Sequence, residues 1–98
     1  MAPSESVLDN IEKFTWDSRE AVAYEAAVEA INFAIGAYSA RLATETSRST
    51  PNRSIIAELQ AGQRACALAH DKLRNASPEN IAEARRHFTH LAGSVRAQ

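Results

Sequence analysis

The most regular hydrophobic pattern of the chain lies between residues 21 and 42. Apolar residues recur there at alternating intervals of three and four, which is the spacing of a helix packed against another helix. The positions are Ala21, Tyr24, Val28, Ile31, Ile35, Tyr38 and Leu42. A second series with the same spacing consists of Ala23, Ala26, Ala30, Phe33, Ala37 and Ala40. The pattern predicts a long central helix over about residues 17–47, with two contact faces.

A second amphipathic helix is predicted over about residues 51–75. The polar segment TETSRSTPNRS (44–54) interrupts the first helix, and Thr50 followed by Pro51 resembles an N-cap with proline in the first turn. The apolar positions of this helix are Ile55, Leu59, Gly62, Cys66, Ala69 and Leu73. Gly36 and Gly62 are the places where we expect departures from regular helix.

A third helix is predicted over about residues 78–93. Asn75 tolerates the left-handed conformation that ends many helices, and Ser77 before Pro78 is a typical helix start. The apolar positions are Ile81, Ala84, Phe88, Leu91 and Val95. Gly93 and Ser94 are expected to fray the last turn, because glycine disfavours helix.

Large residues of one helix face small residues of the next when the chain is folded back on itself. A turn near Arg48 pairs the first two helices, and a turn near Ala76 pairs the second helix with the third. The first hairpin joins Tyr38 to Leu59, Ile35 to Gly62 and Ile31 to Cys66, and the second joins Leu68 to Ala84, Ala61 to Leu91 and Ala57 to Val95. The fold class predicted for residues 17–98 is therefore all-α, an antiparallel three-helix bundle.

Residues 1–16 are predicted to form a separate unit, a short N-terminal amphipathic arm. Its apolar residues have helical spacing and lie among acidic and polar ones. A segment this short is marginally helical alone, so it packs either on its own bundle or on another chain. The candidate partner-binding residues are Val7, Leu8, Ile11, Phe14 and Trp16.

The composition argues against a disulfide-stabilised, membrane-spanning or secreted protein. The chain has 98 residues, a formal net charge of −1 and one cysteine, so no intrachain disulfide can form. No run approaches the roughly 20 apolar residues of a membrane span, and residues 1–10 lack the pattern of a secretory signal. We expect a cytoplasmic protein without a membrane partner.

Few residues are candidates for metal binding or catalysis. Glu83, His87 and His90 share one helix, but a zinc site usually needs three or four ligands, and His70 lies elsewhere. Cys66 falls on a contact face, where a small buried residue is expected rather than a nucleophile. No phosphate-binding glycine loop or Gly-x-Ser-x-Gly motif is present. We expect no enzyme activity, no metal and no cofactor.

Charge is distributed unevenly and suggests an alternative function. Residues 1–49 hold eight acids and four bases, whereas residues 50–98 hold four acids and seven bases. Arg53, Arg85 and Arg86 are the candidate contacts of a nucleic-acid-binding regulator, although no recognised binding motif surrounds them. The main prediction is a non-catalytic protein-interaction or regulatory module that forms a homodimer or binds another protein, because self-association adds buried area to a small core.

Overall fold

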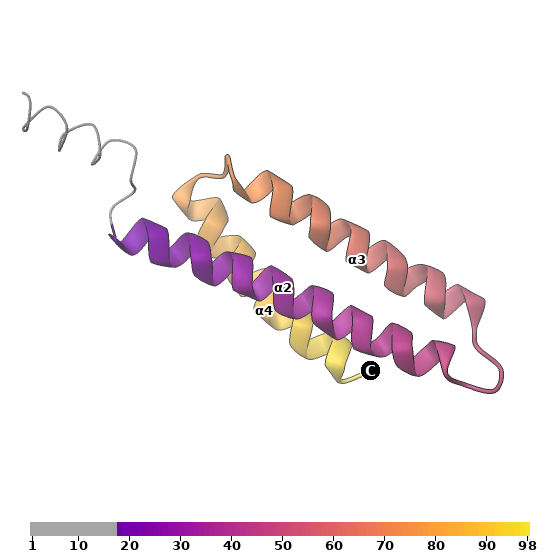
Figure 1. The fold of residues 1–98 in the computed structure, drawn as a ribbon. Helices are drawn as coiled ribbons and strands as arrows, with labels where there is room; N and C mark the ends of the chain where they lie inside the picture. Colours follow the sequence, from indigo (N-terminus) through magenta and orange to yellow (C-terminus); the bar gives the residue numbers. More distant parts are fainter. Residues whose placement is uncertain (1–17) are drawn as a thin grey trace, which may run out of the picture.

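The computed structural model describes residues 18–98 as three helices, which keep the labels of Figure 1. They are α2 (Ser18–Thr46), α3 (Arg53–Leu73) and α4 (Pro78–Arg96). α3 runs antiparallel to α2, and α4 returns in the direction of α2 (Figure 1). The prediction of an all-α three-helix bundle is confirmed. The predicted N-terminal arm, residues 1–16, lies outside the described residues.

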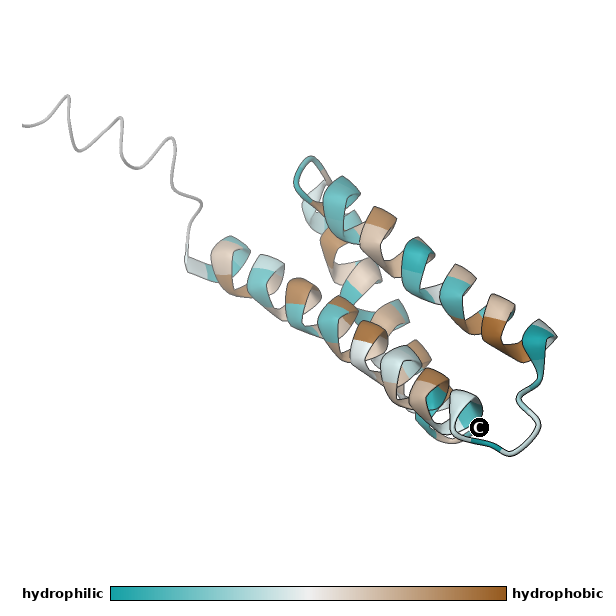
Figure 2. Ribbon diagram, turned by 45° about the vertical axis from the view of Figure 1, so that its right-hand side comes forward, coloured by the Kyte–Doolittle hydropathy of each residue, from teal (hydrophilic) through white to brown (hydrophobic). Residues whose placement is uncertain are grey.

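α2 is the centre of the bundle. Ala27, Ile31 and Ala34 of this helix are fully buried, at 0% exposed. Both α3 and α4 pack along α2, whereas α3 and α4 hardly touch each other. Hydrophobic and hydrophilic residues alternate along each helix (Figure 2). Because α2 is apolar over a wide arc, each of the other helices buries its apolar face against α2.

The predicted pairing of the second helix with the third is wrong. The expected stripe of α4 does form its buried face, with Ile81 and Val95 at 5% and 1% exposed. That face packs on α2, where buried alanines such as Ala30 and Ala37 permit close approach. On α3, the predicted partner Leu68 is 55% exposed.

Packing between α2 and α3 agrees with the predicted antiparallel hairpin. Tyr24, Val28, Ile35 and Tyr38 of α2 pack on the core cluster that contains Cys66 and Leu73 of α3. The ring of Tyr38 lies against Gly62, three residues beyond its predicted partner Leu59. Long helical side chains lean toward the N-terminus of their own helix, which moves the ring by one turn. The predicted second stripe of α2 is only partly buried, since Phe33 is 63% exposed.

Two predicted helix ends are corrected. Asn52, not Thr50, caps α3, and its side chain accepts hydrogen bonds from the backbone N–H groups of Ser54 at 3.0 Å and Ile55 at 3.2 Å. α4 continues through Gly93 to Arg96, because burial of Val95 at 1% exposed holds its last turn on α2.

The start of α4 agrees with the prediction, whereas the backbone at Asn75, Gly36 and Gly62 does not. Ser77 caps α4 as predicted and accepts the N–H of Asn80 at 3.1 Å. No residue in 18–98 has a positive φ, so the turn at Asn75 forms without the expected left-handed residue. The expected departures at Gly36 and Gly62 are also wrong, since both lie inside continuous helices.

Candidate protein-association surfaces

One buried polar group sits where α2 turns into α3, and it has a structural explanation. Glu45 is 2% exposed. Its Oε2 accepts the backbone N–H of Asn52 at 2.9 Å, and its Oε1 accepts from Nη1 of Arg48 at 3.4 Å. The carboxylate thus holds the residue that caps α3. Sequence reasoning missed Glu45, because an acid in a polar segment gives no sign of burial.

Cys66 lies in the core and not in a reactive setting. Its side chain is 1% exposed, in agreement with its predicted place on a contact face. Burial raises the pKa of the thiol, which keeps it protonated at neutral pH. Burial also raises the pKa of the Tyr38 phenol, with a smaller contribution from Cys66. Both groups are therefore neutral at neutral pH where α2 and α3 meet.

The histidines of α4 are on the surface. His87 and His90 are both exposed, and the rings of His87 and Phe88 are nearly perpendicular, with 4.8 Å between their centroids. Within residues 18–98, no group of three or more potential ligands is placed to hold a metal ion.

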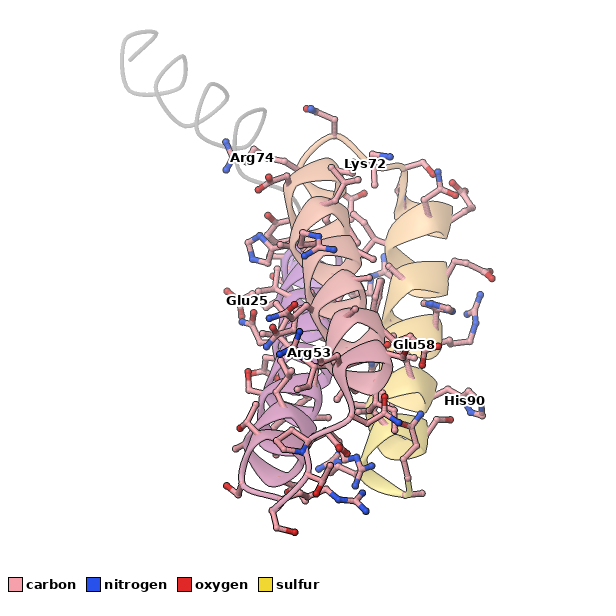
Figure 3. All side chains as sticks on the ribbon, turned by 90° about the vertical axis from the view of Figure 1, so that its right-hand side faces the viewer. Glu25, Arg53, Glu58, Lys72, Arg74 and His90 are labelled. Atoms are coloured by element: carbon pink, nitrogen blue, oxygen red, sulfur yellow. The ribbon has the colours of Figure 1, made fainter. Side chains whose placement is uncertain are left out.

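The first candidate surface is the α3 stripe, defined here as Ala57, Ala61, Ala65 and Leu68. These four residues are exposed and share one face of α3. Figure 3 shows the neighbouring Glu58 on the side of α3 toward α4, while Arg53 lies on the opposite side. The α3 stripe is the face that was expected to bind the third helix. Since α4 packs on α2 instead, no described helix covers it.

The second candidate surface is the α4 groove, a depression of about 550 Å³ between α2 and α4. It is lined by Ala23, Ala82, Arg85, Arg86, Thr89 and His90. The lining thus combines three small residues with two arginines and a histidine. Val22, which precedes Ala23, is 65% exposed.

The predicted nucleic-acid contacts are divided between two helices. Arg85 and Arg86 line the α4 groove, and Arg86 pairs with Glu83 at 3.0 Å. Arg53 is the first residue of α3 and lies on the side of that helix away from α4 (Figure 3). The predicted partner-binding residues Val7, Leu8, Ile11, Phe14 and Trp16 lie outside the described residues.

Comparisons with known proteins give no relative. No protein-family model matches the chain. No curated protein and no solved structure matches it. Among the described helices, none has the length and apolar character needed to cross a membrane.

Proposed function

We propose that this chain is a non-catalytic protein-association module that forms a homodimer, in which a second copy covers the α3 stripe. The observation that carries the proposal is the exposure of Leu68, at 55%, on a helix face that α4 leaves open. Exposed apolar patches on small proteins commonly mark contact sites. A second copy also adds buried area to a core made largely of alanine.

The α3 stripe is self-complementary. In an antiparallel pair of α3 helices related by a two-fold axis, Ala61 faces Ala65 of the other copy. Leu68 then faces Ala57 of the other copy, because both pairs are centred on nearly the same point of α3, close to Gln63. A large residue meets a small one at each end, which is the geometry of close helix packing. A two-fold symmetric contact uses the same patch on both copies and closes on itself.

The test is the mass of the full-length chain in solution. Sedimentation equilibrium over a wide concentration range is expected to give a concentration-dependent dimer of the 10.7 kDa chain. Leu68→Glu buries a charge at each end of the contact and should leave a monomer. The matched control is Ala67→Glu, since Ala67 is the preceding exposed residue of α3 but lies outside the stripe.

Three outcomes contradict the proposal. The wild-type chain remains a monomer at all concentrations, or Leu68→Glu keeps the dimer, or Ala67→Glu loses it equally. Far-ultraviolet circular dichroism of both variants shows whether the helices persist, so that loss of the dimer is distinguished from unfolding.

The nucleic-acid alternative has its own test. Arg85 and Arg86 are adjacent residues that line the α4 groove, and a regulator that uses them would bind DNA or RNA with steep salt dependence. Absence of binding at about 50 mM salt removes this alternative, because low salt favours phosphate contacts.

A further inference from the structure

The α4 groove combines small apolar residues with unbalanced positive charge. Ala23, Ala82 and Thr89 offer no large side chains of their own to fill the depression. Arg85 forms no ion pair within residues 18–98, and the partner of Arg86 is an exposed glutamate. A suitable occupant is therefore a short segment that brings large apolar side chains and negative charge.

The N-terminal arm has this chemistry. Residues 1–16 contain the acids Glu5, Asp9 and Glu12 and the base Lys13, for a net side-chain charge of −2. Its large apolar residues are Val7, Leu8, Ile11, Phe14 and Trp16. The arm thus provides both features that the α4 groove lacks. Charge complementarity of this kind favours one orientation over others.

Distance along the chain favours the arm of the same molecule. The arm joins α2 at Ser18, and Ala23 in the groove lies five residues later, about 7.5 Å along a helix. As a helix, residues 7–16 would span about 15 Å, enough to follow α4 from Ala82 to Thr89, about 10 Å. A tethered segment reaches a nearby site at an effective concentration in the millimolar range. Free protein at micromolar concentration competes poorly with such a segment.

We propose that the α4 groove is the docking site of the N-terminal arm of the same chain. The apolar side chains of the arm fill the depression, and its acids face Arg85, Arg86 and His90. This contact is independent of the proposed dimer, which uses the α3 stripe. The arm thereby covers one side of the bundle and leaves the other side for association.

Trp16, the only tryptophan, provides a direct signal from the arm in the full-length chain. A docked arm shields Trp16 from acrylamide and slows backbone hydrogen exchange in residues 7–14. Arg85→Glu with Arg86→Glu replaces attraction by repulsion, and we expect the docked fraction relative to free to fall by about tenfold. Acrylamide quenching of Trp16 and exchange in residues 7–14 should increase together.

The matched control is Arg53→Glu with Arg64→Glu, which changes the net charge equally on exposed residues of α3. This control should leave quenching and exchange unchanged. Asp9→Arg with Glu12→Arg, placed in the Arg85→Glu and Arg86→Glu background, should restore protection by exchanging the charges. Circular dichroism confirms that the bundle remains folded in each variant.

Several results overturn the proposal. Trp16 in the wild-type chain is as accessible as in urea, or its protection is unaffected by the Arg85 and Arg86 substitutions, or the control variant lowers it equally. Protection that disappears on dilution would place the arm on a second copy and would overturn docking in the same chain. If the proposed dimer does not form, only the measured mass in solution differs from expectation, whereas Trp16 quenching and hydrogen exchange still report on the arm. The two proposals are therefore tested independently.

Discussion

Gly62 gives the sharpest test of packing between α2 and α3. A Cβ atom at this position would lie 2.5 Å from Cε1 and 2.8 Å from the phenolic oxygen of Tyr38. These distances are shorter than van der Waals contact, so Gly62→Ala displaces the tyrosine ring. Gly36 and Gly93 are also helical, but a Cβ atom at either meets no other atom within 4 Å.

Alanine substitutions at the three glycines distinguish the effect of helix propensity on stability from the effect of packing. Replacing glycine by alanine inside an exposed helix stabilises it by about 1 kcal/mol. We therefore expect Gly36→Ala and Gly93→Ala each to raise the free energy of unfolding by about that amount. Overpacking a filled interface costs about 1–3 kcal/mol, so Gly62→Ala should lower the free energy of unfolding by about 1 kcal/mol after the propensity gain.

Urea denaturation followed by circular dichroism measures all three variants. The informative quantity is the difference between Gly62→Ala and Gly36→Ala, expected to be about 2 kcal/mol, since both share the same gain in propensity. In thermal unfolding, 1 kcal/mol corresponds to about 4–8 °C in Tm for a domain of this size. Protein concentration is held constant, because association would shift Tm.

A second substitution, at Tyr38, tests whether its ring causes the destabilisation expected for Gly62→Ala. In the Tyr38→Leu background the ring is absent, and Gly62→Ala should become stabilising like the other two glycine substitutions. If Gly62→Ala stabilises the wild-type chain as much as Gly36→Ala does, the Tyr38 ring moves aside freely and the reasoning fails.

Two further predictions concern buried polar groups. Glu45→Ala should lower the free energy of unfolding by about 1–3 kcal/mol in urea denaturation, because it removes the acceptor of the Asn52 N–H; an effect below that of an exposed substitution such as Glu58→Ala would contradict the role. Burial raises the pKa of Cys66 above 9.0 and that of Tyr38 above 10.0, and both groups are neutral when protonated. The folded chain therefore holds these protons more tightly, so stability is unaffected by them well below the ordinary pKa values of the two groups and falls as the pH rises from there through the raised values. Unfolding curves at increasing pH should show this fall in the free energy of unfolding. Cys66→Ala should remove the part of the fall that occurs at the lower pH values, because the thiol has the lower ordinary pKa. An unchanged dependence on pH in Cys66→Ala would contradict the contribution of Cys66.

The periodicity of the sequence determined most of the local structure. The three-four spacing of residues 21–42 required a helix with a wide apolar arc, and α2 has that arc. Ser77 before Pro78 determined where α4 begins, because a serine side chain and a proline satisfy the first turn of a helix. The alternation of large and small residues between Ile31 and Cys66 also indicated the antiparallel hairpin. The helices and their ends depend on residues near one another in the chain, whereas the hairpin was indicated by matching residue sizes on two consecutive helices.

The tertiary structure decided which faces meet. Ala27 and Ala34 belong to neither predicted stripe of α2, yet both are fully buried, because α3 and α4 lie on either side of them. Alanine has too little apolar surface to mark its own face, so its burial depends on where the neighbouring helices lie. For the same reason the sequence allowed α4 to pack on the alanines of α3 or on those of α2.

The candidate surfaces follow from that choice. The sequence pattern predicts that Leu68 is buried against the third helix. In the structure it is exposed, because α4 packs on α2 instead. Arg85 and Arg86 were visible as a basic pair, but the α4 groove beside them exists only because Ala23 of α2 meets that side of α4. Sequence periodicity thus determined the helices and their apolar stripes. The alanine faces of α2 and α3 are similar in sequence, so only the packing of all three helices determined which of them α4 contacts.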